Sequence, residues 1–248
     1  MTSELLVSGL LFLLLFVGLL LYFTAGVTAG RMPILRRIRA FEALRGFTGQ
    51  AMETGRPLHL SLGLGSMATE TTADSLAGLS VLNYLAEQAA VTGVPPIVSM
   101  ADPTVMLFAQ NTLRTTHVDD QDGVEEAYRH VRWIAPQPAA YAAGVMSILG
   151  IERVGTNVMV GNFGDEYLLI GEAAVRHEID HIGGTSNPNT LPFVYASAQE
   201  TLLGEEIYAA GAYLQKRPAH IGSLVAQDMM RWLVALFILG GIVLASLR

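Results

Sequence analysis

The 248-residue chain contains no cysteine and only one lysine, and charged residues make up just 15% of it. The absence of cysteine excludes disulfide bonds, thiolate metal sites and a cysteine nucleophile. An intrinsically disordered chain is also excluded, because disorder requires high charge and low hydrophobicity. The net charge of −7 leaves no basic face for phosphates, so the composition predicts that nucleic acid is not a partner.

Hydrophobic residues make up 51% of the chain and are concentrated at its two ends. Residues 5–30 carry no charge and are long enough to cross a hydrocarbon core of about 30 Å as a helix. Small residues at 27–30 offer the alternative of a cleaved signal peptide. Glu4 stands where a signal peptide is basic and the apolar run is too long, so we expect a retained transmembrane helix over 1–30.

A second uncharged run covers residues 232–247. It reaches only about 24 Å as a helix, but Arg231 and Arg248 flank it and can extend to the two interfaces. A buried or interfacial amphipathic helix is the alternative, and the lack of a polar face disfavours it. The sequence therefore predicts a second transmembrane helix over 232–248.

Arginine is distributed unevenly around these runs. The segment before the first run has no arginine. Five arginines follow the run closely, and they are Arg31, Arg36, Arg37, Arg39 and Arg45. Because cytoplasmic loops are enriched in Arg and Lys, we expect a plasma (inner) membrane protein with a cytoplasmic central region and both termini outside. The lipid bilayer is then one partner, and these arginines can contact its anionic headgroups.

Between the two runs, short apolar segments alternate with longer helical patterns. The expected strands cover 58–62, 96–100, 131–135, 157–160 and short stretches around 179–182 and 192–196. The expected helices cover 73–91, 104–114, 125–130, 139–149, 166–176 and 200–214. Strands that alternate with helices predict βαβ units. The expected fold class is α/β, with a doubly wound, mostly parallel sheet of the Rossmann or flavodoxin kind, flanked by an N-terminal and a C-terminal transmembrane helix.

The same pattern sets the expected domain boundaries. A basic juxtamembrane helix or linker covers 31–56, and the cytoplasmic α/β domain covers 57–217. A connecting helix over 218–231 then leads into the second membrane helix.

Residues 63–68, Gly-Leu-Gly-Ser-Met-Ala, follow the first expected strand and fit the G-x-G-x-x-A pattern of dinucleotide-binding turns. Asp102 ends the second strand, where a partner of a ribose hydroxyl would lie. It follows the glycines by over thirty residues rather than by about twenty, however. Glu70 also places a carboxylate near the phosphate position. A glycine-rich turn without a ligand is therefore the competing interpretation.

Doubly wound sheets bind ligands at the carboxyl edge of the strands, where the strand order reverses. We expect a small-molecule ligand or cofactor, whose identity the sequence leaves open, to bind near Gly63, Gly65, Ser66, Asp102 and Asn162. Glycine permits close backbone approach, and the Asp and Asn side chains offer hydrogen bonds. Helix capping is the alternative for each polar residue taken singly.

Residues 177–181, His-Glu-Ile-Asp-His, match the H-E-x-x-H pattern. On a helix, His177 and His181 would bind zinc together while Glu178 served as the base for a bound water. The five residues also resemble the third motif of peptide deformylases, but that family needs a cysteine ligand, which this chain lacks. If His177 ends a helix and a strand follows, the two imidazoles cannot converge.

Several expected helices contain glycine in their interior, where each glycine costs about 1 kcal/mol relative to alanine. These are Gly78, Gly144, Gly171, Gly204 and Gly211. Close packing within the chain would offset this cost, and so would an interface between subunits. The glycines therefore leave tight internal packing and a homo-oligomer as alternatives.

Residues 190–197, Thr-Leu-Pro-Phe-Val-Tyr-Ala-Ser, precede an expected helix that contains Gly-Glu-Glu. With apolar spans at both ends, residues 30–245 resemble a family of bacterial membrane proteins catalogued as a domain of unknown function. The resemblance implies a bacterial plasma-membrane protein and carries no catalytic residue.

These features predict a membrane-anchored cytoplasmic α/β module that acts as an oligomeric scaffold or binds a small ligand. Its expected protein partner is a second copy or another membrane protein. We assign no catalytic residue and leave open whether the protein is an enzyme, because no nucleophile–base pair or complete metal-ligand set is visible. The alternative function is a membrane-bound zinc-dependent hydrolase that uses His177, Glu178 and His181.

Overall fold

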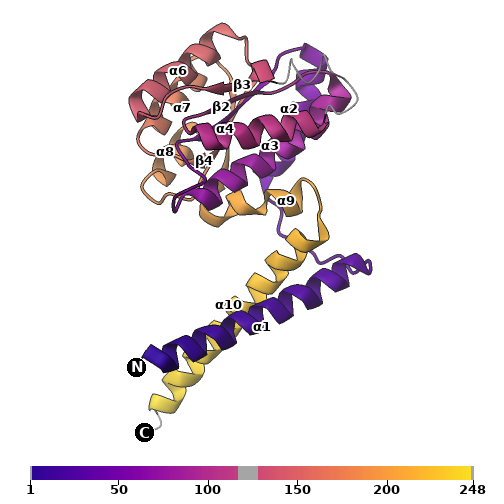
Figure 1. Cartoon of the computed structure of the whole chain (residues 1–248), viewed down its shortest axis with the longest axis vertical. Coiled ribbons are helices and arrows are strands. Elements are labelled where there is room, and N and C mark those ends of the chain that lie inside the picture. The colour runs from indigo at the N-terminus through magenta and orange to yellow at the C-terminus, as the bar shows by residue number, and fades with distance from the viewer. Residues whose placement is uncertain (1, 117–127, 247–248) are drawn as a thin grey trace. The chain divides into compact units, whose positions relative to one another are not determined.

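The computed structural model describes residues 2–116 and 128–246, and it contains two compact units. One consists of Met1–Arg36 together with Gly211–Arg248, and the other consists of Arg37–Ala210. We call them the helical unit and the α/β unit and describe each by itself (Figure 1).

Two long helices, α1 (Thr2–Thr28) and α10 (Pro218–Ser246), form the helical unit. Both contain stretches long and apolar enough to cross a membrane, Leu6–Thr28 and Pro218–Val243. The two helices run in opposite directions (Figure 1). The two helices are in close contact at Gly222 of α10 and Thr24 of α1, because a Cβ added at Gly222 would lie only 2.5 Å from Oγ1 of Thr24. Small residues at such a crossing let two membrane helices approach closely.

The helix α10 runs without a break through the expected connecting helix over 218–231 and into the expected span over 232–248, and its candidate span begins at Pro218. The middle of α10 packs along α1. Phe12 and Phe16 of α1 line a groove of about 480 Å³ together with Met230 and Val234 of α10.

The α/β unit is built on a six-stranded, all-parallel sheet. Its strands are β1 (Leu58–Gly63), β2 (Ile97–Met100), β3 (Val131–Trp133), β4 (Thr156–Asn162), β5 (Asp180–Thr185) and β6 (Glu200–Leu203). Their order in the sheet is β3-β2-β1-β4-β5-β6, with the switch point between β1 and β4. This order confirms the expected α/β class and doubly wound topology.

Helices cover both faces of the sheet (Figure 1). On one face lie α2 (Arg39–Thr54), α3 (Thr72–Thr92) and α4 (Pro103–Thr116). On the other lie α6 (Pro138–Ile151), α7 (Glu166–Arg176) and α8 (Leu191–Ser197). The side chains of Phe41 and Leu44 in α2 are buried, so this part of the expected 31–56 linker belongs to the α/β unit.

Two expected elements are wrong. The stretch 192–196 is not a strand but part of α8, whose first turn accepts Pro192 because proline lacks only an N–H that is unpaired there. The stretch 200–214 is not one helix. It forms β6, the 3₁₀ helix η1 (Gly204–Ala209) and the short α9 (Ala210–Tyr213), with Gly204 at φ 62° after the strand. The helix expected over 125–130 lies partly outside the described residues.

Tight packing within the chain explains most of the helix glycines. A Cβ at Gly78 would lie 2.5 Å from the carbonyl oxygen of Val160, and one at Gly171 would lie 2.6 Å from Oγ of Ser197. Gly144 and Gly211 are similarly close to side chains of their own unit, those of Ile134 and His220. These glycines therefore provide no support for an interface between subunits.

Candidate functional site

The residues predicted for a ligand site lie together at the carboxyl edge of the sheet, around the switch point. Gly63 ends β1 at φ 76° and pairs with Asn162, which ends β4. A Cβ at Gly63 would overlap the carbonyl oxygen of Asn162. At Gly65 it would lie 2.5 Å from Oγ of Ser75. Both glycines are thus required by contacts of the chain with itself.

The turn does not have the geometry of a dinucleotide-binding fingerprint. In that motif the helix starts at the glycine-rich turn, so that its N–H groups face the pyrophosphate. Here α3 starts only at Thr72, and Ser66 and Ala68 lie in the preceding loop. In that loop the Ser66 N–H donates to Oγ1 of Thr71 at 3.0 Å.

Asp102 caps the N-terminus of α4. Its Oδ1 accepts hydrogen bonds from the backbone N–H groups of Thr104 at 2.8 Å and Val105 at 3.2 Å. Burial raises the pKa of Asp102, but these bonds, together with those of the Thr104 and Ser66 hydroxyls, outweigh it and hold the pKa below its ordinary value. The capping alternative therefore accounts for Asp102, and Ser66 lies beside it.

The main polar cluster at this edge is centred on Asp74, which the sequence did not single out. Asp74 is in the first turn of α3 and only 5% exposed. Its Oδ2 accepts from Nδ2 of Asn162 at 3.0 Å. Its Oδ1 accepts from the hydroxyls of Ser186 at 2.7 Å and Tyr208 at 2.6 Å. Across residues 2–116 and 128–246, no basic side chain pairs with this carboxylate.

The zinc interpretation of residues 177–181 is wrong. His177 is the exposed C-cap of α7, Glu178 follows at φ 56°, and His181 lies inside β5. The His181 ring is buried and bonded to Asn157 and Tyr167. The two imidazoles therefore point to different environments. Among the described residues, no group of three or more His, Asp and Glu side chains is arranged to hold a metal ion.

His181 belongs to a buried polar network that the sequence analysis missed. The network consists of Ser61, Tyr141, Ser99, His59, Asn157, His181 and Tyr167. His59, Asn157 and His181 occupy one row across β1, β4 and β5. Nδ1 of His59 lies 2.7 Å from Oδ1 of Asn157, and Nδ2 of Asn157 lies 3.1 Å from Nδ1 of His181.

The network continues into the helices of one face. Nε2 of His181 lies 2.9 Å from the hydroxyl of Tyr167 in α7. Nε2 of His59 lies 3.0 Å from Oγ of Ser99 in β2, which in turn lies 3.1 Å from the hydroxyl of Tyr141 in α6. Burial lowers the pKa of both histidines to about 4, so both are neutral at pH 7. Burial also raises the pKa of Tyr141 to about 12. Because every member is buried and hydrogen-bonded, the network orders the core and is closed to a soluble ligand.

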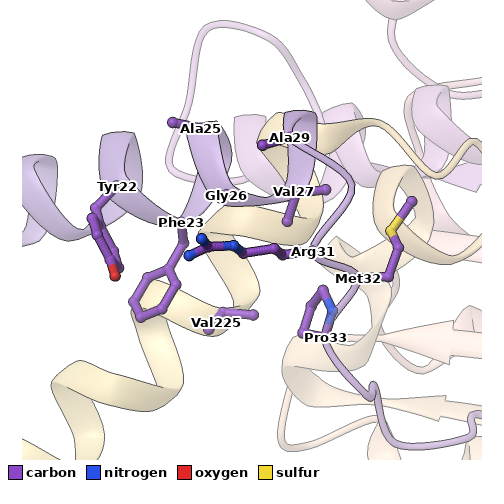
Figure 2. A pocket seen from close by; sticks show the side chains of 10 residues that line it. All are labelled: Tyr22, Phe23, Ala25, Gly26, Val27, Ala29, Arg31, Met32, Pro33 and Val225. Atoms are coloured by element: carbon purple, nitrogen blue, oxygen red, sulfur yellow. The ribbon is translucent and has the colours of Figure 1, made fainter.

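A separate pocket of about 600 Å³ lies in the helical unit, at the end of α1. Its lining is apolar apart from Tyr22 and Arg31. Figure 2 shows Arg31 extending back from the end of α1 toward Phe23, with Val225 of α10 beside it. In the part of the chain that the structure describes, no carboxylate pairs with Arg31.

Comparisons with known proteins give a family but no activity. No curated protein and no solved structure matches the chain. The resemblance found in the sequence is confirmed at the level of the family. The chain belongs to the family described as a domain of unknown function, DUF6754, whose profile matches residues 2–248.

Proposed function

We propose that this protein is a bacterial membrane-anchored α/β module that binds a small polar ligand at the carboxyl edge of its sheet. The observation that carries the proposal is the Asp74 cluster. Three side chains from separate parts of the chain, Asn162 at the end of β4, Ser186 after β5 and Tyr208 in η1, converge on one buried carboxylate beside the switch point. Doubly wound folds bind their ligands at this place.

The chemistry of the edge favours a ligand with hydroxyl or amino groups. The Asp74 carboxyl group accepts its hydrogen bonds from neutral donors, and Asp102 contributes a second carboxylate with a lowered pKa. Tyr208 is 44% exposed, so a ligand hydroxyl or ammonium group can take its place on Asp74. Two carboxylates and a net charge of −7 disfavour a bare phosphate.

We expect thermal-shift assays on the full-length protein to detect this preference. Polyols or primary amines should raise the melting temperature, and inorganic phosphate should not. Tyr208→Phe removes the most exposed donor to Asp74, which the ligand would otherwise have to displace, and should therefore raise the affinity for the stabilising compound about tenfold. Tyr195→Phe, which alters an exposed tyrosine of α8, is the matched control and should bind as wild type. Equal stabilisation of wild type, Tyr208→Phe and Asp74→Asn would place the ligand elsewhere.

We further propose that both candidate spans cross the plasma membrane, with the α/β unit in the cytoplasm and both termini outside. The arginines that follow α1 support this orientation. Arg31 is at the level where lipid phosphates would lie, and its pocket is otherwise mostly apolar. The contact between Thr24 and Gly222 supports retention of α1, because cleavage after Gly30 would remove the packing partner of α10.

Reporter fusions test this topology. Alkaline phosphatase fused after residue 248 should be active outside the cytoplasm, and green fluorescent protein at the same point should be dark. The matched control is a fusion after Arg217, before α10, for which the two readouts should reverse. A residue-248 fusion that is fluorescent and lacks phosphatase activity would refute the orientation.

A further inference from the structure

Two charged side chains lie within the apolar helix α10. Asp228 and Arg231 are almost one helical turn apart, and Oδ1 of the acid is 3.5 Å from Nη1 of the base. They are the only Asp, Glu, Lys or Arg residues in the Pro218–Val243 candidate span.

The packing against α1 shows how deep these charges lie. Arg231 and Phe16 line the same groove, and Gly222 touches Thr24 nearer the other end. Phe16 is close to the middle of the Leu6–Thr28 candidate span. At 1.5 Å per residue, it is about 15 Å from either end of that span. If α1 crosses a bilayer, Arg231 and Asp228 therefore lie near its centre.

These two side chains are not shielded by the helical unit. The Asp228 side chain is 71% exposed and that of Arg231 is 53% exposed. An arginine can extend toward an interface, but an aspartate is too short to do so from this depth. Charged groups near the bilayer centre are costly and are found facing other protein groups rather than lipid.

We propose that the charged stripe of α10, formed by Asp228, Arg231 and Ala235, is the surface through which two copies of this chain associate inside the membrane. The inference rests on the membrane insertion proposed above. An acid and a base on one helix are self-complementary. Around a two-fold axis, Asp228 of each copy meets Arg231 of the other, so one stripe makes the contact twice. Lipid tails offer no hydrogen bonds, and a lipid headgroup does not reach this depth.

The absence of cysteine makes the proposal directly testable by disulfide crosslinking in native membranes. Ala235→Cys places a thiol on the charged stripe, two turns beyond Asp228. Phe237→Cys, at almost the same depth, points to the opposite side of α10 and is 80% exposed, so it is the matched control. We expect crosslinked dimers for Ala235→Cys and few for Phe237→Cys.

Charge variants in the Ala235→Cys background then test the pairing itself. Asp228→Asn keeps the size of the side chain and should reduce association about tenfold. Exchanging the charges, Asp228→Arg with Arg231→Asp, should restore it. The residue-248 fusion is measured in the same cells. An absence of crosslinks, equal crosslinking at both cysteine positions, or no effect of Asp228→Asn in correctly inserted protein would overturn this proposal alone. Loss of insertion in the unmutated chain would overturn both.

Discussion

Lowering the pH from 7 to 5 is expected to reduce the free energy of unfolding of the α/β unit by about 4 kcal/mol, or about 2 kcal/mol for each buried histidine. His59 and His181 are buried in the polar network, and burial lowers the pKa of each to about 4. In the unfolded chain the histidine pKa is about 6.5. The unfolded state therefore binds protons at pH 5 that the folded state does not.

The sign and range of the effect follow from these two pKa values. The contribution of neutral His59 and His181 is fully present above pH 6.5 and is lost as the pH falls from 6.5 to 4. Below pH 4 these two residues cause no further loss. Nearby charge acts in the same direction, because Arg132 lowers the pKa of His59, and His59, once protonated, lowers that of His181.

Denaturant unfolding of the detergent-solubilised protein measures this dependence. A Trp232→Phe background leaves Trp133 of β3 as the fluorescent reporter of the α/β unit. At pH 5 the slope of the unfolding free energy should correspond to about two protons, and to about one in His59→Gln. His177→Ala alters an exposed histidine outside the network and should keep the slope of about two. Histidine NMR titrations on the folded protein give an independent check. A pKa near 6.5 for either buried ring would contradict the prediction.

The polar network also marks the limit of what the strand patterns reveal. Strand β1 alternates Leu58, His59, Leu60 and Ser61, a pattern that usually indicates one face in water. In the structure all six residues of β1 are buried, because α6 and α7 cover the polar side with Tyr141 and Tyr167, which join the polar network. The alternation predicted the strand correctly but gave no sign that its polar face lies in the core.

Local patterns failed where tertiary pairing decides the structure. The order of strands and helices was predictable from apolar periodicity, and the doubly wound topology followed from general rules. The strand β6 forms because its residues pair with Gly183 and Gly184 of β5, a contact that a single segment cannot reveal. By contrast, the expected helix over 166–176 and strand around 179–182 already placed His177 at a helix end, and the structure confirms this, because His177 caps α7 and β5 begins at Asp180.

The candidate site was only partly predictable for the same reason. The rule for doubly wound sheets placed Gly63, Gly65 and Asn162 together at the carboxyl edge beside the switch point, and this is where they lie in the structure. Asp74 is hydrogen-bonded to Ser186, which follows β5, and to Tyr208 in η1, both more than a hundred residues away, and none of the three belongs to a recognisable motif. The sequence signal for Asp74 is that of an acidic residue in the first turn of a helix. Acidic residues are common there because they interact favourably with the helix N-terminus, so the signal does not distinguish a ligand site from a helix end.

Gly183→Ala is expected to destabilise the α/β unit by about 3 kcal/mol or more, because the added methyl group has no space. Gly183 lies in β5, where a Cβ would overlap the hydroxyl of Tyr167 and lie 3.0 Å from Cγ1 of Val194. The hydroxyl cannot simply move aside, since it bonds to Nε2 of His181 at 2.9 Å. Relief of the overlap therefore breaks the buried polar network.

A double-mutant cycle separates this mechanism from a general loss of packing. Tyr167→Phe alone leaves Nε2 of His181 without its partner and should cost about 1–3 kcal/mol. In Gly183→Ala with Tyr167→Phe the overlapping oxygen is absent, so the combined loss should be smaller than the sum by about 1 kcal/mol or more. Gly150→Ala, at the exposed end of α6, is the control. The added Cβ would make an ordinary 3.5 Å contact with Nε2 of His177, so the stability of this variant should be unchanged or slightly raised. Strictly additive losses would show that the hydroxyl of Tyr167 is not what requires glycine at 183.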